Sequence, residues 1–179
     1  TLQFDRDVEF FVDQMDVDES NQAASAANIT RVFLTEKAGP EVDAYRFGKM
    51  ATHAIDEGNA TGEAIDATNV FQRLKADILK VRKYGPSNLI AYLSSEAMDA
   101  LERSEYFQRN INVQNQGTAI ETRVTSLDGV QLVEVWDAER LSTEHDFTSG
   151  FTATGLGINW IIVYKGSVVA KAKLNSVYF

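Results

Sequence analysis

The chemistry that this sequence could carry centres first on its two histidines, His53 and His145. His145 lies between Glu144 and Asp146, and imidazole and carboxylate groups are both metal ligands. Side chains of adjacent residues diverge, however, and no second histidine stands at a useful spacing. We therefore expect His145 to be a solvent-exposed loop residue, His53 to be a surface or boundary residue of a helix, and no metal to be bound.

Residue types suited to nucleophilic catalysis are present, but their arrangement does not favour it. Ser, His and Asp all occur, yet no Gly-x-Ser-x-Gly turn presents a serine nucleophile. The glycines of Gly155-Leu156-Gly157 precede a predicted strand, whereas a phosphate-binding loop follows a strand and opens a helix. The chain contains no cysteine, which removes disulfides, thiolate ligands and cysteine nucleophiles. We expect no enzymatic activity and no cofactor.

Charge and composition restrict the partners. The 179 residues include 17 Lys and Arg against 26 Asp and Glu, a net charge of −9, and residues 1–19 hold seven acids and one arginine. Nucleic-acid-binding proteins usually present a basic face, because phosphate contacts supply most of the affinity. We therefore expect no specific DNA binding. No apolar run approaches the roughly 20 residues that span a bilayer, so we expect no membrane partner.

The N-terminal third of the chain predicts a strand followed by a long helix. Residues 1–13 alternate apolar and polar side chains, which is typical of a strand with one buried face. Its acidic face is either solvated or forms a charged edge that meets another subunit. The chain starts with Thr and shows no signal peptide, so we expect a trimmed or processed product.

A helix is expected from about Asp16, where Asp16 and Glu19 fit a capping box. Bulky residues near its end, among them Ile29 and Phe33, are expected to anchor it to a core. Gly39-Pro40 should stop or kink this helix, and Pro40 is an accepted first residue for a second one. Residues 18–55 thus form one long, interrupted helical element that needs a sheet to lie on.

The rest of the chain predicts a mixed α/β lobe. The glycine-rich residues 57–64 read as a linker between lobes. The elements expected after it are an amphipathic helix at about 67–83, a buried strand at 88–94, a helix capped by Ser94 or Ser95, a hairpin over 120–136 with Asp128-Gly129 at its tip, and strands at 158–164 and after Gly166.

Three stretches together resemble the major capsid proteins of tailed bacteriophages and prophages, which have the HK97-like shell fold. They are Asp13–Ser20, the Ala-rich helix after it, and Pro40–Phe47 with Lys49-Met50-Ala51. The resemblance implies an α+β subunit of two lobes. A peripheral-type lobe, 1–57 with 165–179, would carry a spine helix packed on a sheet, and 58–164 would form an axial-type mixed α/β lobe.

The same resemblance implies a structural role. Copies of the chain would assemble into hexamers and pentamers of an icosahedral shell that encloses double-stranded DNA without binding it specifically. Scaffold, portal and decoration proteins are implied as further partners, and the location is the virion, assembled in the cytoplasm of a bacterial host. The residues we expect at subunit interfaces are Asp5, Arg6, Asp7, Tyr45 and Arg46.

Two other functions remain open from the sequence. An encapsulin-like nanocompartment shell has the same fold but encloses a cargo enzyme. A small-ligand-binding α/β module would instead use a pocket between the lobes.

Overall fold

The computed structural model describes residues 4–9, 11, 19, 25–106 and 124–170. The chain divides into two units, an N-terminal unit of Thr1–Val42 with Ala170–Phe179 and a central unit of Asp43–Val169. This boundary falls inside a helix, whereas the sequence placed its lobe boundary after residue 57. The division into peripheral and axial lobes stays a prediction.

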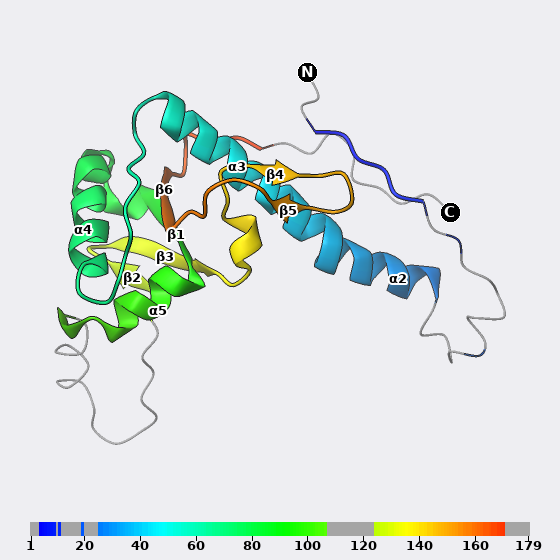
Figure 1. Cartoon of the computed structure of the whole chain (residues 1–179), viewed down its shortest axis with the longest axis horizontal. Helices are drawn as coiled ribbons and strands as arrows, with labels where there is room; N and C mark the ends of the chain where they lie inside the picture. Colours follow the sequence, from blue (N-terminus) through cyan, green and yellow to red (C-terminus); the bar gives the residue numbers. More distant parts are fainter. Residues whose placement is uncertain (1–3, 10, 12–18, 20–24, 107–123, 171–179) are drawn as a thin grey trace. The chain divides into compact units, whose positions relative to one another are not determined.

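The described residues form an α+β structure with a long helical run and a mixed sheet (Figure 1). The helices are α2 (Ala26–Phe33), the π-helical turn η1 (Leu34–Ala38), α3 (Gly39–Asp56), α4 (Val70–Val81), α5 (Ser95–Arg103) and the 3-10 turns η2 (Arg82–Tyr84), η3 (Pro86–Asn88) and η4 (Ala138–Arg140). The strands are β1 (Leu89–Ser94), β2 (Ser126–Leu127), β3 (Val130–Val135), β4 (His145–Asp146), β5 (Thr152–Ala153) and β6 (Trp160–Tyr164).

The helical run passes through Gly39-Pro40 without ending, and its interruption is a π-turn. The Gly39 N–H donates to the carbonyl of Leu34, five residues back, which is the hydrogen bond of a π-helix. Pro40 has no N–H, and its ring crowds the carbonyl four residues back in a regular α-helix. The wider turn relieves that crowding, so an element predicted to stop or kink here continues to Asp56.

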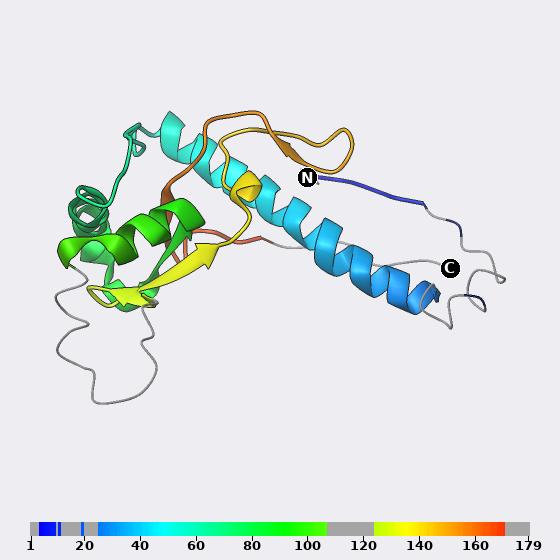
Figure 2. The same cartoon turned by 60° about the horizontal axis from the view of Figure 1, so that its bottom comes forward.

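The four-stranded sheet has the order β2-β3-β1-β6 and belongs to the central unit (Figure 2). β1 runs parallel to β3 and antiparallel to β6. The β2–β3 hairpin turns at Asp128 and Gly129, which both have positive φ, at 51° and 82°. Positive φ at both central residues is the type I′ geometry that the Asp-Gly pair predicts.

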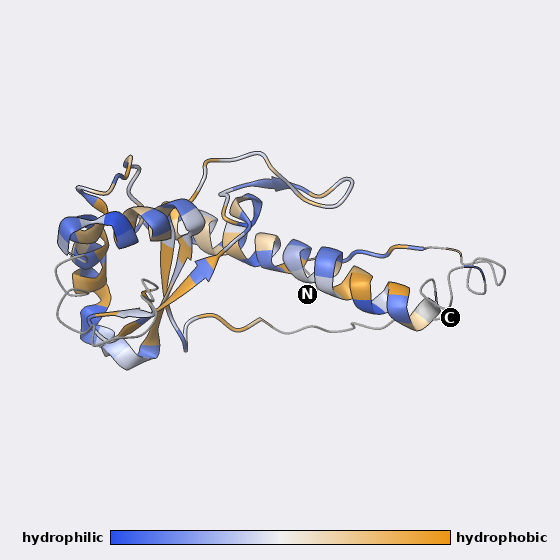
Figure 3. Ribbon diagram, turned by 90° about the horizontal axis from the view of Figure 1, so that it is seen from below, coloured by the Kyte–Doolittle hydropathy of each residue, from blue (hydrophilic) through white to orange (hydrophobic). Residues whose placement is uncertain are grey.

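Each face of the sheet has its own apolar cluster. On one face, side chains of β1 and β3 pack with Leu74 and Ile78 of α4 and Leu101 of α5. On the other, Phe47 of α3 packs with Val135 and Leu141, and its ring meets Tyr92 edge-on at 5.3 Å. A helix of the predicted run therefore packs on a sheet, and Figure 3 shows apolar colour on the strands and on parts of the helices.

Most predicted elements of the central unit are confirmed, with shifted ends. α4 is Val70–Val81 rather than starting near residue 67, and a turn capped by Asp66 precedes it. Ser94 caps α5, where its Oγ accepts from the Ala97 N–H at 3.1 Å. The outer part of the predicted hairpin before residue 124 lies outside the described residues.

The strands predicted near the two ends of the chain are not confirmed in the described residues. Residues 4–9 and 11 have no regular secondary structure. The prediction of a strand over 1–13 is therefore wrong for these described residues. A strand needs a neighbour for its main-chain groups, and no described strand pairs with this segment. Residues 168–170 are likewise not a strand. The helix start at Asp16 and the chain after residue 170 lie outside the described residues.

Candidate functional site

Three of the predicted interface residues lie in the segment 4–9 of the N-terminal unit. Asp5 and Asp7 are exposed and form no ion pair with any described residue. Arg6 is engaged within its own unit, with its Nε 2.8 Å from Oε1 of Glu41 at the start of α3. The two acids are thus available to another molecule, while the arginine holds the segment to the helical run.

The other two predicted interface residues lie on α3 in the central unit. Tyr45 is half-buried, because its ring meets Phe147 edge-on with the centroids 6.1 Å apart. Arg46 is exposed, and its nearest acid is Asp43 at 3.8 Å. Exposed pairs of this length contribute about 0–1 kcal/mol, so Arg46 is free to exchange its partner. Tyr45 serves first as an internal contact.

The apolar side of α2 is less buried than the sequence predicts. Ile29, Val32 and Phe33 are spaced i, i+3 and i+4, which places them on one side of the helix. Sequence reasoning expected them to anchor the helix to a core. Among the side chains described from residue 25 to 42, however, only that of Pro40 is buried. We call Ile29, Val32 and Phe33 the α2 face.

A second surface joins the end of α4 to the end of β6, and sequence reasoning missed it. The rings of Tyr84 and Tyr164 lie 5.7 Å apart, and the Lys83 ammonium is 5.1 Å from the Tyr84 ring centroid. Lys165 donates to the Ser87 carbonyl at 2.9 Å. Val168 is 41% and Val169 90% exposed. We call Lys83, Tyr84, Tyr164, Lys165, Val168 and Val169 the tyrosine–lysine patch.

His145 is not the exposed loop residue that the sequence predicts. It is half-buried in β4, and its Nε2 lies 2.8 Å from the Glu139 carbonyl. On its other side Nδ1 faces Gly48 of α3, where an added Cβ would come within 3.3 Å. The histidine therefore helps to seat the β4–β5 hairpin on α3. His53 is exposed, as expected.

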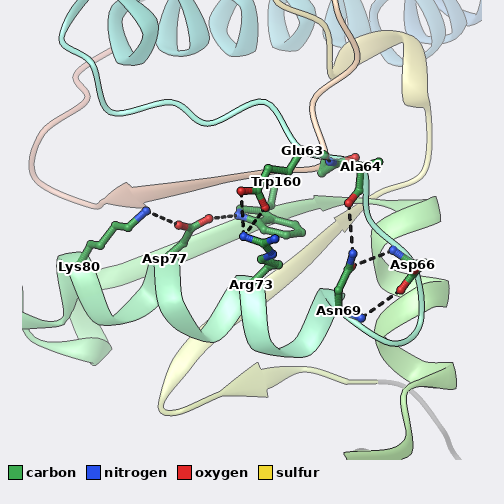
Figure 4. A network of polar contacts seen from close by, with 9 residues as sticks. Glu63, Ala64, Asp66, Asn69, Arg73, Asp77, Lys80 and Trp160 are labelled. Atoms are coloured by element: carbon green, nitrogen blue, oxygen red, sulfur yellow. Dashed lines mark hydrogen bonds and ion pairs between the residues drawn. The ribbon is translucent and has the colours of Figure 1, made fainter.

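The predicted linker is confirmed as a loop, and its second half is fastened to the sheet and to α4 (Figure 4). Glu63 pairs with Arg73 through both carboxylate oxygens, at 2.8 and 2.6 Å. The Glu63 carbonyl accepts from the Asn159 side chain at 3.1 Å. Beside this pair, Trp160 Nε1 donates to Asp77 at 3.0 Å, which ties β6 to α4.

Two carboxylates in this unit have shifted pKa values. The Thr68 hydroxyl, then the N–H groups of Thr68 and Asn69, donate to Asp66 and lower its pKa below the usual value. The Thr148 hydroxyl and N–H lower the pKa of Asp146 in the same way. Donors favour the ionised form. Both residues are exposed and shape local turns, so we assign them a structural role.

The described surface also has two shallow, open hollows. One lies between residues 65–68 and α5, and the other runs along α4 beside Phe71 and Tyr106. Among the described residues, no group of three or more His, Asp or Glu side chains is placed to hold a metal ion. No helix in the described part of the chain has the length and apolar character needed to cross a membrane.

Comparisons of this chain with protein-family models, with curated proteins and with solved structures found no match.

Proposed function

We propose that this protein is a structural subunit that assembles with copies of itself, through hexamers and pentamers, into the icosahedral shell of a phage or prophage. The shell would enclose double-stranded DNA in the virion after assembly in the bacterial cytoplasm. The proposal takes its specific form from the sequence resemblance to HK97-like capsid proteins.

The observation that carries the proposal is that the two parts of the helical run differ in burial. From Ala44 onward it is anchored, because Ala44, Phe47 and Ala51 are buried. Before that point, Ile29 of the α2 face is only half-buried and Val32 is exposed. An amphipathic helix normally buries its apolar side, and a second copy could complete the burial of these two side chains.

Charge supports the same proposal. A subunit with a net charge of −9 repels the phosphate backbone, and a container must release its contents. Each subunit contact in a closed shell needs little free energy of its own, because many contacts form together. Half-exposed apolar side chains and exposed acids suit weak, repeated contacts of this kind.

The test is electron microscopy and sedimentation of the intact protein across salt and concentration. We expect rings or shells. Ile29→Asp with Phe33→Asp should reduce them to monomers without changing the melting of the central unit. The matched control, Ala27→Asp with Thr35→Asp, adds the same charge at exposed positions of the run and should still assemble. Monomers of the unaltered protein under all conditions would contradict the proposal.

The contents of particles from the host separate the two shell functions. Nuclease-protected double-stranded DNA supports a capsid. A packaged protein in place of DNA supports an encapsulin-like compartment.

A further inference from the structure

The inference starts from two short sequences that the proposed function does not use. Asn28-Ile29-Thr30 and Asn59-Ala60-Thr61 both match Asn-x-Ser/Thr, the acceptor sequence for attachment of a sugar to an asparagine side chain. A transferase must reach the asparagine amide and the hydroxyl two residues later at the same time. The structure places the two matches in different surroundings, and only one of them meets this requirement.

The first match lies in α2 and is closed to an enzyme. Asn28 and Thr30 are both half-buried. Side chains two residues apart on a helix do not face the same way, so the amide and the hydroxyl point in different directions. The Asn28 Oδ1 accepts from the Arg31 side chain at 2.9 Å, and the Thr30 hydroxyl oxygen is buried. A transferase therefore cannot bind this match while α2 is folded.

The second match lies in the linker between α3 and α4 and is open. Residues 57–64 belong to no helix or strand, and all of them are exposed. A Cβ added at Gly58 or Gly62, on either side of the match, would meet no heavy atom within 4 Å. No hydrogen bond to a described residue holds the Asn59 amide or the Thr61 hydroxyl. Both groups are thus free to enter a second protein.

The linker is held at both ends, which presents the match without burying it. Just after α3, the main-chain N–H of Asn59 donates to the Ala54 carbonyl at 2.8 Å. Before α4, Glu63 pairs with Arg73 at 2.6 Å. Neither contact uses the Asn59 side chain. A transferase can therefore bind the loop while the elements on both sides keep their structure, as is usual for functional loops on a rigid scaffold.

We propose that Asn59 is an acceptor for an N-linked sugar and that Asn28 is not. The donor is a hexose activated by a nucleoside diphosphate. Nδ2 of Asn59 attacks the anomeric carbon, so that a C–N bond forms while the bond from this carbon to the diphosphate oxygen breaks. The nucleoside diphosphate leaves, and one amide proton passes to a base of the transferase. The proposal is independent of the shell function.

The test treats the purified full chain with UDP-glucose and a soluble N-glycosyltransferase that recognises Asn-x-Ser/Thr, followed by mass spectrometry of its peptides. We expect one hexose on Asn59 and none on Asn28. Asn59→Gln should abolish the modification. Thr61→Ala should reduce it by about tenfold or more, because the acceptor sequence requires a hydroxyl at its third position. Thr61→Ser keeps that hydroxyl and should keep the modification.

The matched control, Asn28→Gln, removes the other acceptor asparagine and should leave the extent of modification unchanged. A synthetic peptide of residues 26–33 should accept a hexose at Asn28, because so short a helix is not stable alone in water. That result would show that the fold, rather than the local sequence, protects Asn28. Absence of hexose on Asn59 in the folded chain, equal modification of both asparagines there, or an unmodified 26–33 peptide would each overturn the proposal.

Discussion

Asp66 shows how one carboxylate fixes the start of a helix. Its Oδ1 accepts from the N–H groups of Thr68 and Asn69 at 2.8 and 3.0 Å, and Asn69 Oδ1 accepts from the Asp66 N–H in return. This reciprocal arrangement is a capping box. It caps the turn that leads the linker into α4, which begins at Val70.

The Asp66 cap should make stability depend on pH. Its pKa is lowered on folding, so the ionised form contributes stability above its unfolded pKa. That contribution is lost as pH falls through the lowered folded pKa. Asp66→Asn keeps an acceptor oxygen but removes the charge. The difference in unfolding free energy between the two proteins, measured by urea titration, should shrink with acidification. A pH-independent difference would contradict this.

The two glycines of the 155–157 loop should respond differently to alanine. A Cβ at Gly155 would overlap the Thr143 hydroxyl and the main chain of Glu144, whereas one at Gly157 would meet nothing within 4 Å. Gly155→Ala should cost about 1–3 kcal/mol of unfolding free energy, as overpacking does. Gly157→Ala should stay within about 0.5 kcal/mol of the unaltered protein. Equal melting curves for the two variants would refute the close approach.

At the scale of elements, the helical run carries two phenylalanines with different environments. Phe47 is 7% exposed and sits in the cluster under the sheet, whereas Phe33 is only half-buried. The run thus contains one segment that stabilises the fold and another whose apolar side chains stay partly exposed.

Truncating these side chains should separate folding from association. Phe47→Ala should lower the unfolding free energy of the central unit by about 3–5 kcal/mol, observed through tryptophan fluorescence. Phe33→Ala should leave that unfolding transition nearly unchanged and weaken association instead. Comparable destabilisation by both would show that the α2 face belongs to the folded core.

Local patterns were sufficient to predict most helices and strands of the central unit. The 3.6-residue spacing of Leu74 and Ile78 marked α4, and Asp128-Gly129 marked the hairpin. The parallel pairing of β1 with β3 could not be predicted, because it depends on contacts far apart in sequence. The partial exposure of the α2 face could not be predicted for a related reason, since periodicity identifies an apolar side but not what covers it. The tyrosine–lysine patch joins segments some 80 residues apart, and no local pattern indicates it.

At the scale of the whole molecule, the charge is unevenly distributed. Residues 1–19 account for −6 of the net −9, and the described bases Lys83 and Lys165 lie in the central unit. Such a distribution favours contacts between copies over contacts with polyanions.

The protein should therefore not bind free double-stranded DNA. In an electrophoretic mobility assay at about 50 mM salt, where phosphate contacts are strong, we expect no shift of a linear duplex. The unaltered assembly and the dissociated Ile29→Asp, Phe33→Asp variant should behave alike. A shift that disappears as salt is raised would reveal a basic surface. It would contradict the proposal that the shell encloses DNA without binding it.

The first half of the linker has a practical consequence. A side-chain carbon added at Gly58 or Gly62 would meet no heavy atom within 4 Å, and every residue from 57 to 64 is exposed. The chain is fixed at the start of this stretch by the Asn59 N–H bonding to Ala54, and at its end by Glu63 and Arg73. Lengthening a surface loop costs little entropy. A foreign epitope grafted between Ala60 and Thr61 would therefore be displayed to antibodies without disturbing either anchor.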